Sequence, residues 1–222
     1  MIDMHTHILP QVDDGSKDLN TSLAMLKEEM DEGVTSVYLT PHQNKTNLTG
    51  PLLKERFQSF LSSVKENGID MDIRLGAEIY YYPGLKKDLR SGKALTMDET
   101  KYVLVEFSTR METNIAEIAY ELHAAGYKPI IAHIERYPYL KKNDYFDIKE
   151  AGGLIQINSN AFSHIFYRRT IKYLLKNDLV DYVASDAHDT HRRKVNFSFV
   201  HSYIKKKYPA LYTKLMKMKK LG

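Results

Sequence analysis

Residues 1–7 read MIDMHTH, a short apolar run that begins at Ile2 and ends with two histidines, His5 and His7. Alternate side chains of a strand project from the same face, so a strand over Ile2–His7 would present both imidazoles together. A lone His-x-His pair is weak evidence for a metal site, because a histidine at a strand end is more often an ordinary polar residue. The fold and the chemistry therefore depend on whether other strands end in comparable residues.

Short apolar, β-branched or aromatic runs punctuate the sequence, and helix-like stretches separate most of them. The expected strands are Ile2–His7, Val34–Thr40, Ile73–Tyr82, Tyr102–Phe107, Pro129–His133, Leu154–Asn158 and Tyr182–Ser185. Apolar residues recur at helical spacing from Leu19 to Met30, before Gly33, and a second helix starts near Asn114 and ends at Gly126. Further helices are expected over 51–66, 143–151, 163–176 and 195–207.

This alternation of strand and helix predicts a parallel sheet with helical crossovers. Seven strands fit a barrel of βα units better than an open doubly wound sheet. No G-x-G-x-x-G follows the first strand and no G-x-x-x-x-G-K-[ST] occurs, so a nucleotide-binding fold has no support. We expect one α/β domain over residues 1–222, built as a TIM-like barrel.

Reactive residues of such barrels lie at the C-terminal ends of the strands. Six of the seven expected strands end in imidazole or carboxylate groups, and the loop after the first strand adds an acidic pair. The candidate ligands are His5, His7, Asp13, Asp14, His42, Glu78, Glu106, His133, Asp186 and His188. So many ligands exceed the needs of a single ion, and the set predicts a multinuclear metal site.

Imidazole and carboxylate ligands without thiolate suit Mn, Fe or Zn rather than Ca or Cu(I). Sites that hold several such ions a few ångströms apart usually hydrolyse phosphate esters, because the ions ionise water and stabilise both oxygens of the displacement. Arg136, three residues after His133, would supply a bidentate contact to a phosphate group.

The chain contains no cysteine, which excludes disulfides, Cys-ligated zinc and every enzyme with a thiol nucleophile. There is no apolar run near 18 residues and no basic-then-apolar leader. We therefore expect neither a membrane span nor a secretory signal, and a cytoplasmic protein.

The net charge of +4 is unevenly distributed, because residues 190–222 hold ten Lys or Arg and no Asp or Glu, whereas residues 1–189 carry a net −6. The basic C-terminal helix expected over about 195–222 is either a solvated face or a contact for an acidic partner or an anionic membrane surface. The acidic body argues against a nucleic-acid partner.

The motifs MIDMHTH, VDDG, TPH, GAEIYY, AHIERY and SDAH, in this order, resemble the polymerase-and-histidinol-phosphatase (PHP) superfamily. They are most similar to its bacterial capsule and exopolysaccharide tyrosine-phosphatase branch, over residues 1 to about 190. The resemblance implies a distorted (β/α)7 barrel with three metal ions, usually manganese.

Carried over position by position, the resemblance implies three ligand sets and two phosphate-binding arginines. The first ion would be held by His5, His7 and Asp186, with Glu78 bridging. The second would take Glu78, Glu106 and His133, and the third Asp14, His42 and His188. The arginines that match those gripping the substrate phosphate are Arg136 and Arg193.

The substrate implied by the resemblance is phosphotyrosine on a membrane-associated bacterial tyrosine kinase. Without a thiolate, the nucleophile would have to be water ionised by the metal ions. Two alternatives remain open: a small-molecule phosphatase such as histidinol phosphatase, and a non-catalytic accessory domain. The polar stretch over residues 43–50 is expected to act as a lid.

Overall fold

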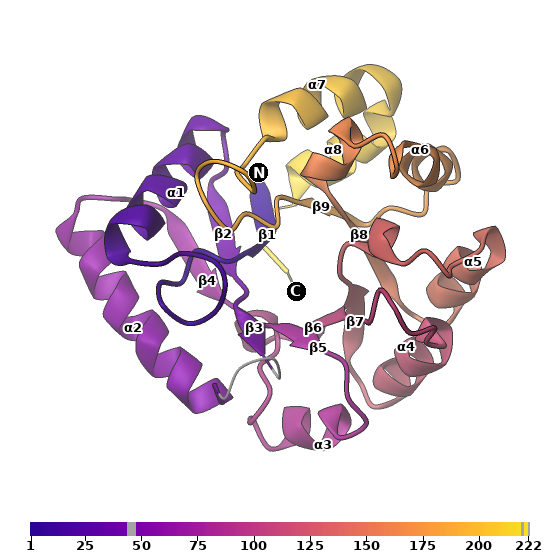
Figure 1. Ribbon diagram of the computed structural model, residues 1–222, viewed down its shortest axis with the longest axis horizontal. Helices are drawn as coiled ribbons and strands as arrows, with labels where there is room; N and C mark the ends of the chain where they lie inside the picture. Colours follow the sequence, from indigo (N-terminus) through magenta and orange to yellow (C-terminus); the bar gives the residue numbers. More distant parts are fainter. Residues whose placement is uncertain (44–47, 219, 222) are drawn as a thin grey trace.

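The computed structural model describes residues 1–43, 48–218, 220 and 221, and the expected parallel barrel is confirmed in this part of the chain. The strands are β1 Ile2–Thr6, β2 Ser36–Leu39, β3 His42–Gln43, β4 Asp72–Leu75, β5 Glu78–Tyr80, β6 Tyr102–Glu106, β7 Lys128–Ile131, β8 Leu154–Asn158 and β9 Tyr182–Ala184. They surround a central axis, and the helices lie outside them (Figure 1).

The sheet closes on itself even though it is divided into two ladders, β1-β2-β4 and β3-β5-β6-β7-β8-β9. A parallel bridge between Thr6 and Ala187 joins the end of β1 to the segment after β9. Around this bridge the amide of His7 donates to the Ala187 carbonyl at 2.8 Å, and the amide of Asp186 donates to the His5 carbonyl at 2.9 Å. Ring closure therefore places the first and last ligand-bearing segments side by side.

The single strand predicted over Ile73–Tyr82 is wrong, because this stretch is divided into β4 and β5, and the short strand β3 after Val34–Thr40 was not expected. Pro41, which has no amide hydrogen to donate, separates β2 from β3. Gly76 separates β4 from β5, and a Cβ added there would lie 2.5 Å from the Met97 Sδ. Both breaks fall just before a predicted ligand, so they redirect the ends of these two strands.

The helices form a ring against the outer face of the strands. They are α1 Leu19–Asp31, α2 Gly50–Glu66, α3 Leu85–Arg90, α4 Ile115–Ala124, α5 Lys142–Glu150, α6 Arg168–Lys176, α7 Phe197–Lys207 and α8 Pro209–Lys217, with short 3₁₀ turns at Met97–Glu99, Ile134–Arg136 and Ser159–Ser163. The α4 cap is as expected: Asn114 Oδ1 accepts from the Glu117 amide at 3.2 Å, and Gly126 has a φ of 93°.

Two helix predictions need correction, and one helix was not expected. The helix expected over 163–176 begins only at Arg168, because the residues before it form short turns such as that from the Tyr167 amide to the His164 carbonyl. The basic C-terminal helix is two helices, since Pro209 disfavours helical backbone at Tyr208. The short helix α3 was not expected. Residues 44–47 of the expected lid lie outside the described residues.

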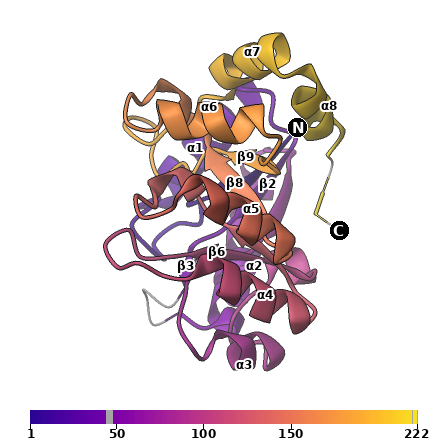
Figure 2. The same ribbon diagram turned by 90° about the vertical axis from the view of Figure 1, so that its right-hand side faces the viewer.

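Two separate apolar cores fill the molecule. The larger one lies between the helices and the sheet. The smaller one consists mainly of strand residues with no α-helix residue, which places it inside the barrel; it includes Met4, Leu104 and Ile130. Leu221 is buried in this inner core, and its amide donates to the Tyr38 hydroxyl at 2.9 Å. The segment after α8 therefore returns to the barrel (Figure 2) and closes the end opposite the predicted ligands.

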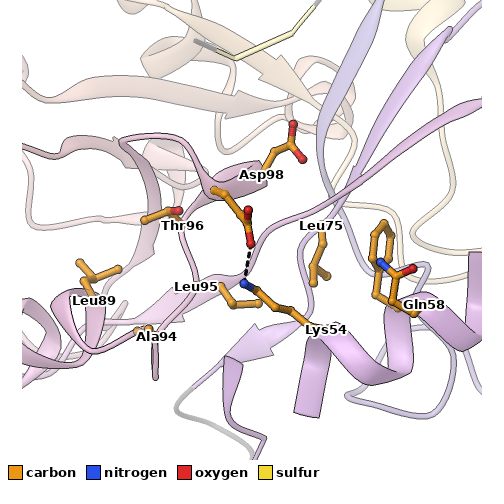
Figure 3. A pocket seen from close by; sticks show the side chains of 11 residues that line it. Lys54, Gln58, Leu75, Leu89, Ala94, Leu95, Thr96 and Asp98 are labelled. Atoms are coloured by element: carbon orange, nitrogen blue, oxygen red, sulfur yellow. Dashed lines mark hydrogen bonds and ion pairs between the residues drawn. The ribbon is translucent and has the colours of Figure 1, made fainter. Parts of the chain in front are cut away.

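A cavity of about 470 Å³ lies outside the barrel, between α2, β4 and the segment that precedes β6. An ion pair of 2.5 Å between Lys54 and Glu99 spans it (Figure 3). None of the predicted ligands lines this cavity, so it is separate from the strand ends. None of the helices among the described residues is both long and apolar enough to span a membrane.

Candidate metal centre

The predicted ligands gather at the C-terminal end of the barrel, although they come from segments up to 183 positions apart in the sequence. The strands β1, β3, β5 and β6 carry four of them: His5, His42, Glu78 and Glu106. The others follow strand ends directly or lie in the β1–α1 loop: His7, Asp14, His133, Asp186 and His188. The fold thus brings together all nine side chains that the resemblance implies as ligands.

Glu78 lies at the centre of the imidazoles and is buried. Its Oε2 lies 2.8 Å from His42 Nδ1, 3.3 Å from His7 Nε2 and 3.5 Å from His5 Nε2. Its Oε1 lies 2.7 Å from His133 Nε2. One carboxylate therefore touches four histidines, which is the position required of a bridging ligand.

Asp186 connects the imidazoles to the two arginines. Its Oδ1 lies 3.5–3.6 Å from nitrogens of His5, His7 and His188. Its Oδ2 accepts hydrogen bonds from Arg136 Nη2 at 2.6 Å and Arg193 Nη2 at 2.7 Å. The carboxylate thus presents one oxygen to the histidine cluster and the other to the two arginines.

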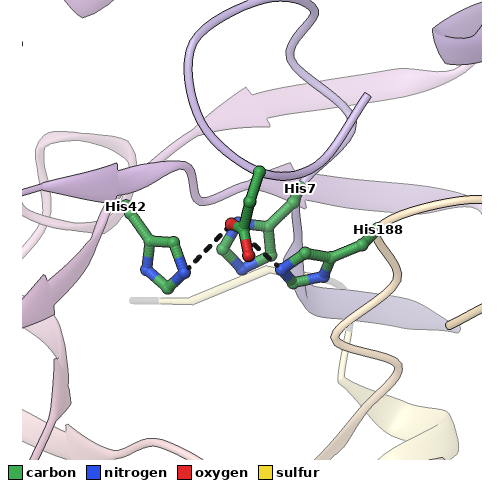
Figure 4. A group of neighbouring side chains, drawn as sticks. His7, His42 and His188 are labelled. Atoms are coloured by element: carbon green, nitrogen blue, oxygen red, sulfur yellow. Dashed lines mark ion pairs between the residues drawn. The ribbon is translucent and has the colours of Figure 1, made fainter. Parts of the chain in front are cut away.

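Within the described part of the chain, three groups of side chains have ligand atoms close enough together to hold an ion. They are His5, His7 and Asp186; His7, Asp14, His42 and His188; and His42, Glu78 and Glu106, each with its ligand atoms within 4.8 Å of one another. In the second group the Asp14 carboxylate lies between His42 and His188, at 3.3 and 3.5 Å from their Nε2 atoms (Figure 4).

These groups correspond closely but not completely to the sets implied by the resemblance. The first and third sets are present together, the third with His7 added. In the remaining group His42 joins Glu78 and Glu106, whereas His133, the residue expected there, contacts Glu78 alone of these two carboxylates. The arrangement of the second expected set is therefore less compact than the other two.

The carboxylates of the cluster favour protonation of His42, which in turn favours ionised carboxylates. Burial alone would lower the pKa of His42, but hydrogen bonds with Asp14 and Glu78 outweigh it and raise the pKa to about 9. Burial likewise opposes charge on Glu78, yet the surrounding histidines hold its pKa well below the usual range. Because metal ions and protons compete for the same lone pairs, cations could replace these protons.

Some buried polar atoms of the cluster have no hydrogen-bond partner among the described residues. They include Asp186 Oδ1 and His188 Nε2, both at side chains no more than 3% exposed. Buried polar atoms normally find partners, and those without one call for an explanation such as an ion. Oxygen and nitrogen donors at these positions fit a divalent transition metal.

Several buried residues orient the ligands from behind. Asp13, a candidate ligand from the sequence that the resemblance does not include, accepts from His7 Nδ1 at 2.7 Å and from the His42 amide at 2.9 Å. A Cβ on Gly15 would lie 2.2 Å from the His7 carbonyl, so only glycine lets this loop pack against His7. Asp13 therefore fixes the His7 ring on the side away from the cluster.

Gln156 and Asn158 are functional candidates that the sequence reading missed. They lie on β8, the one expected strand without a ligand, and both are buried. Gln156 Oε1 accepts from the His133 amide at 2.6 Å and lies 3.3 Å from His5 Nδ1, and Gln156 Nε2 donates to Asn158 Oδ1 at 2.7 Å. Their i, i+2 spacing in an otherwise apolar strand was the available signal.

Asn158 completes this chain of contacts, because its Nδ2 donates to Asp186 Oδ2 at 2.8 Å. The two amides of β8 thus link His5 and His133 to Asp186. Asp186 and His133 also share a left-handed backbone conformation, with φ values of 55° and 32°. Such strain persists only where the surrounding contacts impose it.

The fold and the side chains at its C-terminal end define a parallel α/β barrel with a candidate polynuclear metal centre. The chain belongs to the capsular polysaccharide synthesis family CpsB/CapC, whose sequence pattern matches residues 1–220. The expected relation to bacterial capsule tyrosine phosphatases is confirmed.

The relatives and solved structures agree with this assignment. Tyrosine-protein phosphatase CpsB of Streptococcus pneumoniae is 35% identical over 225 residues, covering 95% of this chain and 92% of its own. Tyrosine-protein phosphatase YwqE of Bacillus subtilis is 33% identical over 202 residues, covering 87% and 79%. A crystal structure from work on YwqE and CpsB, named there as metal-dependent tyrosine phosphatases, matches with a TM-score of 0.91 at 28% identity over 98% and 92% of the chains.

A histidinol phosphate phosphatase of Lactococcus lactis matches with a TM-score of 0.59 over 96% of this chain and 94% of its own. The sequence identity is 13%, so this likeness concerns the fold alone.

Replacing Gln156 by Leu should lower metal affinity about 10- to 100-fold, because the variant loses the acceptor that holds the His133 backbone and faces the His5 ring. Calorimetric titration of Mn²⁺ into the metal-free protein measures this. Gln58→Leu, on the exposed surface of α2, is the matched control and should bind metal normally. A folded Gln156→Leu variant with unchanged affinity would show that this side chain does not orient the ligands.

Proposed function

We propose that this protein is a metal-dependent phosphatase that hydrolyses phosphotyrosine in proteins. The observation that carries the proposal is the cluster of five histidines and four carboxylates at the barrel end, in a chain without cysteine. Thiol-based tyrosine phosphatases need a low-pKa thiolate as nucleophile, which this chain does not possess. The names of its relatives, which are tyrosine-protein phosphatases, support the same reaction.

The nine ligands would hold up to three ions, and their nitrogen and oxygen donors suit Mn²⁺, with Fe or Zn as alternatives. When bound, the ions supply Lewis acidity and make hydroxide available at neutral pH. Glu78 and Asp186 are placed to bridge between ion positions, because each faces several of the histidines. The orienting contacts of Asp13 and Gln156 keep the rings in place.

Arg136 and Arg193 would bind the substrate phosphate. Each donates one N–H to Asp186 Oδ2, and a guanidinium has five N–H groups, so donors remain for phosphate oxygens. Their side chains are 31% and 36% exposed, so a substrate can reach them. Asp186 would position both guanidinium groups beside the metal ions.

The leaving group also favours phosphotyrosine. A phenolate has a conjugate acid with a pKa of about 10, so it leaves more readily than the alkoxide of a serine ester. Charge stabilisation at phosphorus can then suffice without a strong general acid. Histidinol phosphate is an alkyl ester and does not have this advantage.

We infer that the natural substrate is a tyrosine-phosphorylated bacterial kinase that controls capsule or exopolysaccharide assembly, and that the protein acts in the cytoplasm. The family's connection to capsular polysaccharide synthesis supports this inference. Five of the ten basic residues of 190–222 belong to α7 and α8. Contact of these helices with the kinase or an anionic membrane surface stays a prediction.

The function is tested by comparing hydrolysis of a phosphotyrosine peptide, a phosphoserine peptide and histidinol phosphate. The phosphotyrosine peptide should be the best substrate. Exhaustive chelation should lower its turnover by on the order of 10²-fold or more, and Mn²⁺ should restore it. Turnover that survives complete metal removal, or a preference for histidinol phosphate, would refute the proposal.

Replacing either Arg136 or Arg193 by Met should lower kcat/KM for phosphotyrosine by about 10²–10³-fold, because a preorganised donor to the phosphate is lost. Asp186 keeps the other arginine and Asn158 as donors, so bound metal should be unchanged. Arg90→Met, exposed on α3, provides the control. Full activity in both site variants would rule out the proposed phosphate contacts.

A further inference from the structure

We propose that the cavity between the first turns of α5 and α6 binds a negatively charged group of the substrate polypeptide, next to the phosphotyrosine. This group would be an acidic side chain or a second phosphate. The inference rests on the proposed phosphatase function and adds a substrate preference to it.

The cavity has a volume of about 600 Å³ and is lined by three cationic side chains, Lys141, Lys142 and Arg169. All three are exposed, whereas Tyr145 is buried and Tyr173 half-buried among its lining residues. The cations thus border a recess with aromatic walls. Such a recess can enclose a side chain, whereas a flat cationic surface could only attract one.

The positive charge of this cavity is not neutralised within the described part of the chain. None of its three cations takes part in an ion pair there. The one acidic lining residue, Asp144, accepts a hydrogen bond from the Lys141 backbone amide at 2.6 Å as part of the α5 cap. Lys142 Nζ lies 5.3 Å from the centre of the Tyr173 ring, which leaves its charge intact.

The N-termini of two helices add to the positive electrostatic potential of this cavity. Both α5 and α6 begin at this cavity, and each helix has nine residues. Tyr167, the residue before α6, makes no side-chain cap hydrogen bond, so the first amides of α6 lack that partner. Partial positive charge at both helix starts favours an anion.

The cavity lies on the catalytic side of the barrel. The two helices are neighbours in the ring and follow the C-terminal ends of β7 and β8 (Figure 1). Arg136 precedes Lys141 by five residues, so their Cα atoms are at most about 18 Å apart. Tyr167 is close enough to Arg136 to affect the pKa of the guanidinium. If Arg136 holds the phosphotyrosine, peptide residues within about five positions of that phosphotyrosine would therefore reach the cavity.

Neighbouring features suit an extended polypeptide. Ile165 and Phe166, in the connection between β8 and α6, are 77% and 81% exposed and could contact apolar residues of a substrate. Across the first turn of α5, a second cavity of about 360 Å³ carries the carboxylates of Glu112, Asp144 and Asp147. An anionic membrane would meet Glu112 and Asp147 as well, whereas a peptide can place its negative group in the cationic cavity, which these two carboxylates do not line.

The test compares kcat/KM for phosphotyrosine peptides that carry Asp, a second phosphotyrosine or Asn at each of positions 1–6 on either side of the target. The wild-type protein should prefer one or two positions of Asp or phosphotyrosine over Asn. In the triple variant K141Q/K142Q/R169Q, the ratio of kcat/KM for the preferred peptide over the Asn peptide should fall about tenfold, mainly through a change in KM. Turnover of p-nitrophenyl phosphate, which has no flanking residues, should not change.

The matched control is K65Q/K172Q/K176Q, which removes the same charge from exposed positions that do not line the cavity. It should keep the preference, and added salt should weaken that preference in the wild type. Thermal melting of both variants checks that they fold.

Each other outcome overturns the proposal. Equal kcat/KM for acidic and neutral peptides in the wild type, or equal losses in both triple variants, would show that the cavity is no subsite. Loss of binding to phosphatidylserine vesicles by K141Q/K142Q/R169Q, with the peptide preference retained, would assign the cations to a membrane instead. If no phosphotyrosine peptide is hydrolysed at all, the proposed function itself fails, which is a result distinct from the loss of preference.

Discussion

The site depends on two buried carboxylates, Glu78 and Asp186, being held against five imidazoles at the end of the barrel. Burying charges costs several kcal/mol per group unless partners surround them. Here the partners are contributed by strands from both ends of the chain, which meet only because the β1 and β9 segments join through Thr6 and Ala187. Closure of the barrel and assembly of the site are therefore one event, and a loosened ring would leave uncompensated charge.

The rest of the structure maintains this arrangement from behind. Pro41 and Gly76 lie between neighbouring strands just before His42 and Glu78, so these two residues belong to the second ladder, where they are paired with each other. Asp13 holds His7, and the amides of β8 hold His5, His133 and Asp186. The left-handed backbone of Asp186 costs on the order of 1–3 kcal/mol, which these contacts offset. Ligand positions are thus overdetermined before any ion binds.

The sequence predicted the barrel and its ligands because both produce local signals: apolar strand-like runs, helical spacing, and polar residues at strand ends. Gln156 and Asn158 were missed because an amide within a buried strand resembles an ordinary polar residue until its partners are known. Gly76, at the break between β4 and β5, packs against Met97, which is distant in sequence, so no local pattern revealed this contact. The break at Tyr208 did have a local signal, the following Pro209. The late start of α6 comes from turns whose exposed Ile165 and Phe166 give no periodic signal.

The most direct test of a polynuclear centre is anomalous diffraction from crystals of the protein grown with Mn²⁺. The account predicts more than one manganese peak at the C-terminal end of the barrel, with carboxylate oxygens of both Glu78 and Asp186 in direct coordination. A single peak elsewhere, or no ordered peak beside these two carboxylates at saturating Mn²⁺, would contradict it.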